Sequence, residues 1–256
     1  MPNDASQSSA NPLCSSVLSS VFPCCQPSMS QPNSPHSDPH QGQPIVNRGR
    51  PLQEARAAMV LLHGRGASAQ SILQLADELD RQDFAYLAPQ AAGSTWYPYS
   101  FLAPLEQNEP YLSSALRLVE SVVQRLLAAG IPSERLFLLG FSQGACLSLE
   151  FVARHPRRYG GVAALTGGLI GPDGTPRDYP GSLEGTPVFL GTSDPDPHVP
   201  LTRVEESARV LERMGARVNL RTYPGMPHTI NRDELDHVRA LMDAVAEGGS
   251  EGVDHP

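Results

Sequence analysis

The chain has 256 residues, of which 19 are basic and 27 are acidic, so its formal charge at pH 7 is −8. This charge argues against a general affinity for nucleic acid or for an anionic membrane surface. All the basic residues are arginine, which excludes Schiff-base chemistry, and no apolar run reaches the roughly 18 residues that a membrane span needs. The length suffices for one α/β domain with a substantial core.

The beginning of the chain differs in composition from the rest. Residues 1–42 are rich in Ser, Pro, Gln and Asn and contain few apolar residues, which predicts a disordered tail. The four cysteines match neither a disulfide framework nor a zinc site, and the start of the chain lacks the charge of a signal peptide. We therefore expect an α/β domain over 43–248, a flexible tail over 249–256, and a cytoplasmic protein without a metal or other cofactor.

Short apolar segments alternate with amphipathic segments from residue 43 onward. Most of the apolar segments lack two-residue alternation, as is typical of parallel strands that are covered on both faces. The order predicts an α/β fold with a mostly parallel sheet, right-handed crossovers and helices on both faces. The expected strands are 44–47 (an edge strand), 57–62, 84–88, 136–139, 162–165, 188–190 and 218–223, and the expected helices are 71–81, 111–129, 143–154, 201–214 and 232–246.

One serine lies where an expected strand meets an expected helix. The segment Gly140-Phe141-Ser142-Gln143-Gly144 directly follows the strand at 136–139. In this context G-x-S-x-G indicates a nucleophile elbow, a crowded turn that projects the serine hydroxyl and needs small residues two positions before and after it. The alternative is an ordinary glycine-rich turn, because the pattern also occurs by chance.

Two later strand ends supply the other groups that a serine nucleophile needs. A serine hydroxyl requires a base within hydrogen-bond reach, and the base requires an orienting acid. Because function in open α/β sheets gathers at the carboxyl ends of the strands, we expect His228, after the last strand, to be the base. His198 is a weaker candidate because it shares a loop with the acids. In that loop Asp196 is the preferred acid and Asp194 is the alternative.

Backbone amides near the serine could stabilise an oxyanion. One should be the N–H of Gln143, the residue after the serine. The other should come from the glycine-rich loop after the strand at 57–62, where Gly64 and Gly66 flank Arg65.

An aromatic loop follows the strand at 84–88. Residues 93–104 contain the only Trp and two of the seven Tyr of the chain. We expect Trp96 and Tyr97, together with Gly168 after a later strand, to line an acyl or aryl pocket. The alternative is that this loop packs down as part of the core.

These motifs together resemble the carboxylesterase/phospholipase family of α/β-hydrolases, which includes the acyl-protein thioesterases. The resemblance covers about residues 45–247 and implies a single α/β-hydrolase domain. It implies Ser142 as nucleophile, Asp196 as acid, His228 as base and oxyanion amides at positions 65 and 143. It also implies a small-molecule ester or thioester substrate and is compatible with a homodimer. The matching segments, in family order, are 62–67, 88–90, 140–145, 196–200 and 225–228.

Two departures from the eukaryotic thioesterases bear on the substrate. Arg65 stands where they usually carry an apolar residue, and Gly191-Thr192-Ser193 replaces their usual His-Gly, with two extra residues ahead of Asp196. These departures favour a bacterial-type serine esterase of broad specificity. Short connections predict no large lid and an open, shallow pocket for small soluble esters. The alternatives are an acyl thioesterase or lysophospholipase with the same triad, and a non-catalytic binding protein with the same fold.

Overall fold

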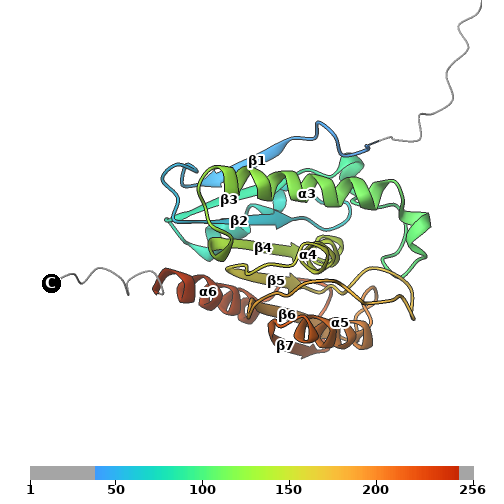
Figure 1. The fold of residues 1–256 in the computed structure, drawn as a ribbon. Coiled ribbons are helices and arrows are strands. Elements are labelled where there is room, and N and C mark those ends of the chain that lie inside the picture. Colours follow the sequence, from blue (N-terminus) through green and yellow to red (C-terminus); the bar gives the residue numbers. More distant parts are fainter. Residues whose placement is uncertain (1–37, 248–256) are drawn as a thin grey trace, which may run out of the picture. The chain divides into compact units, whose positions relative to one another are not determined.

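A seven-stranded sheet forms the centre of the computed structural model, which describes residues 38–247; the predicted tail residues 1–37 and 249–256 lie outside this range. The strand order is β1-β3-β2-β4-β5-β6-β7 (Figure 1). Every neighbouring pair is parallel except β1 and β3. The predicted fold class is therefore confirmed. The strands are β1 (Ile45–Gly49), β2 (Ala57–Leu62), β3 (Phe84–Pro89), β4 (Leu136–Phe141), β5 (Gly161–Leu165), β6 (Pro187–Asp194) and β7 (Arg217–Pro224).

Six α-helices within residues 38–247 connect and cover the strands. The helix expected over 71–81 is instead two short helices, because the backbone around Leu73 and Gln74 changes to tighter bonds: Ala76 N–H donates to Leu73 O and Asp77 N–H to Gln74 O. The α-helices are α1 (Ala69–Ile72), α2 (Leu75–Leu79), α3 (Tyr111–Ala128), α4 (Gln143–Arg154), α5 (Leu201–Arg213) and α6 (Arg232–Glu247), and short 3₁₀ turns lie at Ala92–Ser94, Leu105–Asn108 and Ser133–Arg135.

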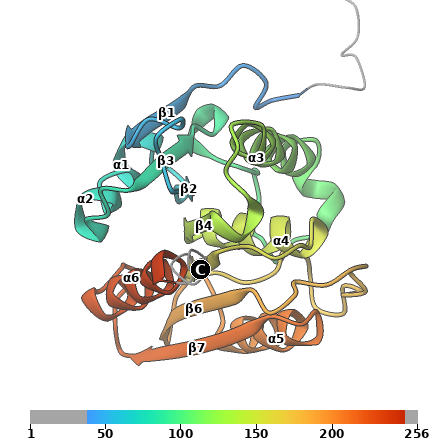
Figure 2. The same ribbon diagram turned by 60° about the vertical axis from the view of Figure 1, so that its left-hand side comes forward.

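Helices cover both faces of the sheet and create two hydrophobic cores. Helices α1, α2 and α6 lie on one face, whereas α3, α4 and α5 lie on the other (Figure 2). Alternate residues of the central strands belong to the two cores. In β2, Met59 and Leu61 pack with α1, α2 and α6, whereas Val60 and Leu62 pack with α3, α4 and α5. All six residues of β2 are buried, which explains why this strand reads as a continuous apolar run.

The packed region begins before residue 43. His40 is fully buried. Its Nε2 lies 3.0 Å from Trp96 O, and its Nδ1 accepts a hydrogen bond from Ala92 N–H over 3.0 Å. Asp38 forms an ion pair with Arg117 over 3.2 Å. Residues 38–42, which composition assigns to the tail, therefore pack against the α/β domain and help to hold the loop that carries Trp96.

The connection between β5 and β6, residues 166–186, contains no helix, and a buried carboxylate is one of the groups that hold it. Glu150 of α4 accepts hydrogen bonds from Ile170 N–H over 3.0 Å and from the Tyr179 hydroxyl over 3.1 Å. Gly171 N–H donates to Phe101 O over 2.7 Å, so the connection also supports the aromatic loop. Residues 38–247 include no inserted lid domain, as predicted.

Candidate active site

The candidate site lies where the strand order of the sheet changes direction, between β2 and β4. From β2 the chain moves to β3 on one side, and it then crosses to β4 on the other side of β2. The loops that follow β2 and β4 consequently border a crevice at the carboxyl ends of these strands. Gly64, after β2, comes so close to the serine after β4 that an ideal Cβ on Gly64 would lie 3.5 Å from Ser142 Cβ.

Ser142 occupies a strained turn that only glycine neighbours permit. Its φ of 54° and ψ of −118° lie outside the common regions, and its N–H donates to Leu165 O over 2.9 Å. A Cβ on Gly140 would lie 2.2 Å from Gly144 O, and a Cβ on Gly144 would lie 2.0 Å from Leu62 O. Larger residues at these two positions would push strand and helix apart. The local geometry is that of a nucleophile elbow.

Three predicted side chains form one hydrogen-bonded chain. The Ser142 hydroxyl donates to His228 Nε2 over 2.9 Å, and His228 Nδ1–H donates to Asp196 Oδ2 over 2.8 Å. This donor assignment corresponds to the neutral imidazole that a general base requires. Gly225 N–H donates to Asp194 O over 2.9 Å and ties the loop after β7 to the end of β6. That bond helps to hold His228 beside Asp196.

Asp196 is a fully buried carboxylate that is satisfied by hydrogen bonds. Its side chain is 0% exposed. Besides the bond from His228, it accepts bonds from the Ser193 hydroxyl at 2.9 Å, His198 N–H at 2.8 Å and Val199 N–H at 2.9 Å. Burial by itself raises the pKa of Asp196, but these bonds outweigh burial and hold the pKa below its usual value. The carboxylate therefore stays ionised at neutral pH.

Asp194 and His198, the alternatives for the acid and the base, lie beside this chain of hydrogen bonds. Asp194 is exposed and contributes its backbone carbonyl. The His198 ring packs edge-on against His228, with 4.9 Å between ring centroids, and the contacts within residues 38–247 include no hydrogen bond from it to Ser142. Sequence reasoning did not assign a role to Ser193. A hydroxyl three residues before an acid is too common in loops to single out.

The two amides expected to bind an oxyanion have free N–H groups. Gln143 is the first residue of α4, where the helix dipole favours negative charge. Within the described part of the chain, neither Arg65 N–H nor Gln143 N–H has a protein acceptor. Both N–H groups are thus available to an acceptor outside the described part of the chain.

A cavity of about 490 Å³ adjoins Ser142. Its side chains combine aromatic rings with Arg65, His198 and His228, and no Asp or Glu lines it. Tyr99, one of the lining residues, is 56% exposed, so the lining reaches the surface of the protein. The lining residues are Gly64, Arg65, Ala67, Tyr97, Pro98, Tyr99, Ser100, Phe101, Phe141, Ser142, Gln143, Cys146, His198, Val199 and His228.

Of the three residues predicted to line this pocket, only Tyr97 does so. Trp96 is fully buried and its indole N–H donates to His63 O over 2.8 Å. Gly168 N–H points toward Cys146 Sγ, 3.5 Å away. The assignment of Trp96 and Gly168 to the pocket was therefore wrong, because both lie behind the lining. The aromatic loop both packs into the core, through Trp96, and walls the pocket, through Tyr97 to Phe101.

The lining of the cavity also contains a cysteine, Cys146, which lies one helical turn after Ser142. It is a free and buried thiol, and burial raises its pKa to about 12. At neutral pH the thiol stays protonated and unreactive. In residues 38–247, no group of three or more His, Cys, Asp or Glu is arranged to hold a metal ion.

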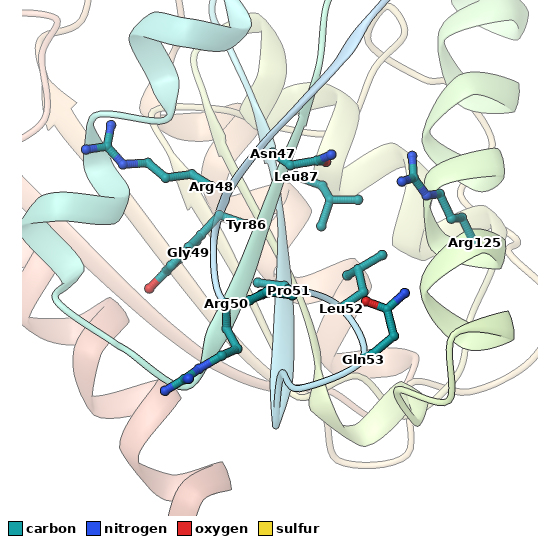
Figure 3. A pocket seen from close by; sticks show the side chains of 11 residues that line it. Asn47, Arg48, Gly49, Arg50, Pro51, Leu52, Gln53, Tyr86, Leu87 and Arg125 are labelled. Atoms are coloured by element: carbon teal, nitrogen blue, oxygen red, sulfur yellow. The ribbon is translucent and has the colours of Figure 1, made fainter.

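Another cavity, of about 310 Å³, lies near the opposite end of β3 (Figure 3). In Figure 3, Arg48 and Arg50 point away from Arg125, which extends from α3. Arg48 is paired with Asp77 over 2.5 Å. The lining contains no serine, cysteine, histidine or carboxylate, so this cavity lacks the groups for nucleophilic or acid–base catalysis.

Comparison with known families matches the Phospholipase/Carboxylesterase family over residues 44–246. The chain belongs to the phospholipase/carboxylesterase family. A solved phospholipase/carboxylesterase from Dyadobacter fermentans is 50% identical, with a TM-score of 0.76, and the match covers 78% of this chain and 96% of that protein. This membership makes the chain a hydrolase of the carboxylesterase type.

Two curated relatives of the family are more distant. A probable carboxylesterase SOBER1-like from Arabidopsis thaliana is 24% identical, over 73% of this chain and 78% of the relative. The acyl-protein thioesterase 1 of Saccharomyces cerevisiae is 28% identical, over 75% of this chain and 93% of the relative. The family thus includes esterases and thioesterases. None of the helices within residues 38–247 combines the length and apolar character that crossing a membrane requires.

Proposed function

We propose that this protein hydrolyses carboxylic esters through an acyl-enzyme intermediate, with Ser142 as nucleophile, His228 as general base and acid, and Asp196 as orienting acid. The observation that carries the proposal is the continuous hydrogen-bonded chain from the Ser142 hydroxyl through both nitrogens of His228 to Asp196. Such a chain beside an open cavity is the arrangement that activates a serine hydroxyl.

In the first half of the reaction, Ser142 Oγ attacks the ester carbonyl carbon and His228 Nε2 takes the hydroxyl proton. The ionised Asp196 stabilises the imidazolium that results. The carbonyl oxygen becomes an oxyanion and accepts hydrogen bonds from the N–H groups of Arg65 and Gln143. When the tetrahedral intermediate collapses, the C–O bond to the alcohol breaks and His228 gives its proton to the leaving oxygen.

In the second half, water replaces the alcohol. His228 Nε2 removes a proton from the water while its oxygen attacks the acyl carbon, and the same two amides stabilise the second oxyanion. Collapse breaks the bond to Ser142 Oγ, which recovers its proton from His228, and the carboxylic acid leaves. The alcohol and the carboxylic acid together contain all the atoms of the ester and the water, and the enzyme returns to its starting state.

An acyl thioesterase or a lysophospholipase would use the same groups. The yeast relative named acyl-protein thioesterase 1 supports the thioester alternative. We favour small soluble esters, because the cavity of about 490 Å³ is in the size range of small-molecule pockets and opens directly to the surface. The cytoplasmic location and the homodimer stay predictions from sequence.

The acyl-enzyme itself provides the test. Rapid mixing with p-nitrophenyl acetate should release a burst of p-nitrophenol equal to the enzyme concentration when deacylation is slower than acylation. Acid quenching followed by peptide mass spectrometry should find the acetyl group on Ser142. Acetylation of another residue, or turnover without reaction of a fluorophosphonate with Ser142, would refute the proposal. Parallel assays with an acyl thioester and a lysophospholipid rank the alternatives, and an inert Ser142 would favour a non-catalytic binding protein.

A further inference from the structure

The two residues with free backbone N–H groups, Arg65 and Gln143, also direct their side chains to one carbonyl. Arg65 Nη2 donates to Tyr97 O over 3.0 Å, and Gln143 Nε2 donates to the same oxygen over 2.8 Å. The Thr95 hydroxyl also donates to Tyr97 O, over 3.1 Å, so this oxygen accepts three hydrogen bonds. Tyr97 O therefore joins the loop after β2 to the beginning of α4.

Arg65 contacts more of this segment than one carbonyl. Its Nη1 donates to Pro98 O over 2.8 Å, and its Nη2 also donates to Tyr99 O over 2.6 Å. Three consecutive carbonyls thus surround the guanidinium. The planar fork of arginine suits such an arrangement, whereas a lysine ammonium on a flexible stem holds it less firmly.

Gln143 holds the same segment from the other side. Its side-chain Oε1 accepts a hydrogen bond from Trp96 N–H over 2.9 Å, and the residue is only 6% exposed. The orientation of the amide is determined, because a backbone N–H can only donate and a carbonyl can only accept. The segment 96–99 is consequently hydrogen-bonded to both Arg65 and Gln143, the two residues with free backbone N–H groups.

We propose that the Arg65 side chain is a positioning residue that sets the separation and direction of the two oxyanion amides by holding Tyr97 O together with Gln143. The proposal rests on the proposed function, because it assigns a role in the reaction of Ser142. Loss of one oxyanion donor costs about 10²- to 10³-fold in kcat, and a displacement of about 1 Å can cost about 10²-fold. A displaced but present amide should therefore cost about 10- to 100-fold.

The test compares Arg65→Met, Arg65→Lys and the control Arg213→Met, which removes an equal charge from an exposed position on α5. For each variant, kcat and KM for p-nitrophenyl acetate, the rate of fluorophosphonate labelling and the melting temperature are measured. A role confined to stability would change the melting temperature, and a role in substrate binding would change KM. A positioning role changes kcat and the labelling rate together, because both reactions build up negative charge on an oxygen that the two amides would bind: the acyl oxygen of the tetrahedral intermediate in hydrolysis, and the phosphoryl oxygen at five-coordinate phosphorus in labelling.

We expect Arg65→Met to lower kcat by about 10- to 100-fold with KM within about threefold, and Arg65→Lys to lose less, while Arg213→Met behaves as wild type. A kcat within about twofold of wild type, or a change confined to KM, would overturn the proposal. If Arg65→Met does not fold, an unchanged kcat in Arg65→Lys overturns it. Ser142→Ala in the same assay separates the two proposals: full activity there refutes the esterase mechanism, whereas full activity only in the Arg65 variants refutes the positioning role.

Discussion

His228 Nδ1 lies 2.8 Å from Asp196 Oδ2, and the Asp196 side chain is completely buried. A buried acceptor at this position keeps the proton on Nδ1 and leaves Nε2 free to accept from Ser142. Asp196 thus selects the tautomer of His228 as well as its orientation.

Asp196→Asn should lower kcat by about 10³- to 10⁴-fold with little change in KM. The asparagine can present an N–H to Nδ1, and His228 would then carry its proton on the wrong nitrogen. Asp194→Asn is the matched control, and we expect it to stay within about twofold of wild type because Asp194 is exposed. Steady-state kinetics on one p-nitrophenyl ester compares them. A larger loss in Asp194→Asn would reverse the assignment of the acid.

The charge of the cavity predicts a preference between esters that carry opposite charges. Arg65 lines the cavity and no carboxylate does, so negative acyl groups are favoured over positive ones. Monomethyl succinate should have a higher kcat/KM than the methyl ester of 4-(trimethylammonio)butyrate, by about two- to fivefold at low salt. A pH-stat at two ionic strengths measures the ratio. The preference should shrink with salt, and a preference for the cation would contradict the role of the lining charges.

Glu234 should make the stability of the protein depend on pH. The residue is fully buried, and burial raises its pKa from 4.5 to about 7. Its Oε2 accepts a hydrogen bond from Asn231 N–H over 2.9 Å, and its Oε1 has no partner in residues 38–247. Between pH 4.5 and 7 the folded state therefore binds the proton more tightly than the unfolded chain does.

The sign of this effect follows from that difference in proton binding. As the pH rises through this window, wild type should lose free energy of unfolding relative to Glu234→Gln, by on the order of 3 kcal/mol in total. Glutamine can keep the helix cap without ionising. Urea unfolding of both proteins at pH 5, 6 and 7 measures the difference. A constant difference across the window, or a rise toward pH 7, would show that Glu234 is not protonated when folded.

Cys146 should be chemically inert in the folded protein despite its place in the lining. Burial raises its pKa to about 12, so thiolate is scarce at pH 8. In a variant with serine at the other three cysteines, Cys14, Cys24 and Cys25, iodoacetamide should leave both Cys146 and esterase activity unchanged. Mass spectrometry should detect alkylation only after unfolding in urea. Rapid alkylation of the native protein with loss of activity would indicate an accessible thiol.

The sequence predicted the sheet well because the five central strands, β2 to β6, are buried on both faces. β2 is buried throughout and therefore appears as an unbroken apolar run. The break between α1 and α2 was missed because it depends on a change from i−4 to i−3 hydrogen bonds, which the apolar pattern does not encode. Composition assigned His40 to the tail, although its ring is buried against Trp96.

In the site, the sequence could identify side chains with their own chemistry but not contacts made by the backbone. Ser142 and His228 are distinguished by residue type and by their position after strands. The convergence of Arg65 and Gln143 on Tyr97 O is invisible in sequence, because the acceptor is a main-chain carbonyl that every residue has. Trp96 was placed in the pocket because an aromatic residue in a loop can face either the core or the solvent.

Removal of the Ser142 hydroxyl tests the central claim most directly. Hydrolysis of p-nitrophenyl acetate is measured for wild type, Ser142→Ala and the control Ser148→Ala. The control removes a buried hydroxyl of α4, which donates to Gly144 O over 3.0 Å. We predict that Ser142→Ala loses about 10³-fold or more of kcat with an unchanged melting temperature, while Ser148→Ala retains most of its activity. Activity in Ser142→Ala equal to that of Ser148→Ala would contradict the account.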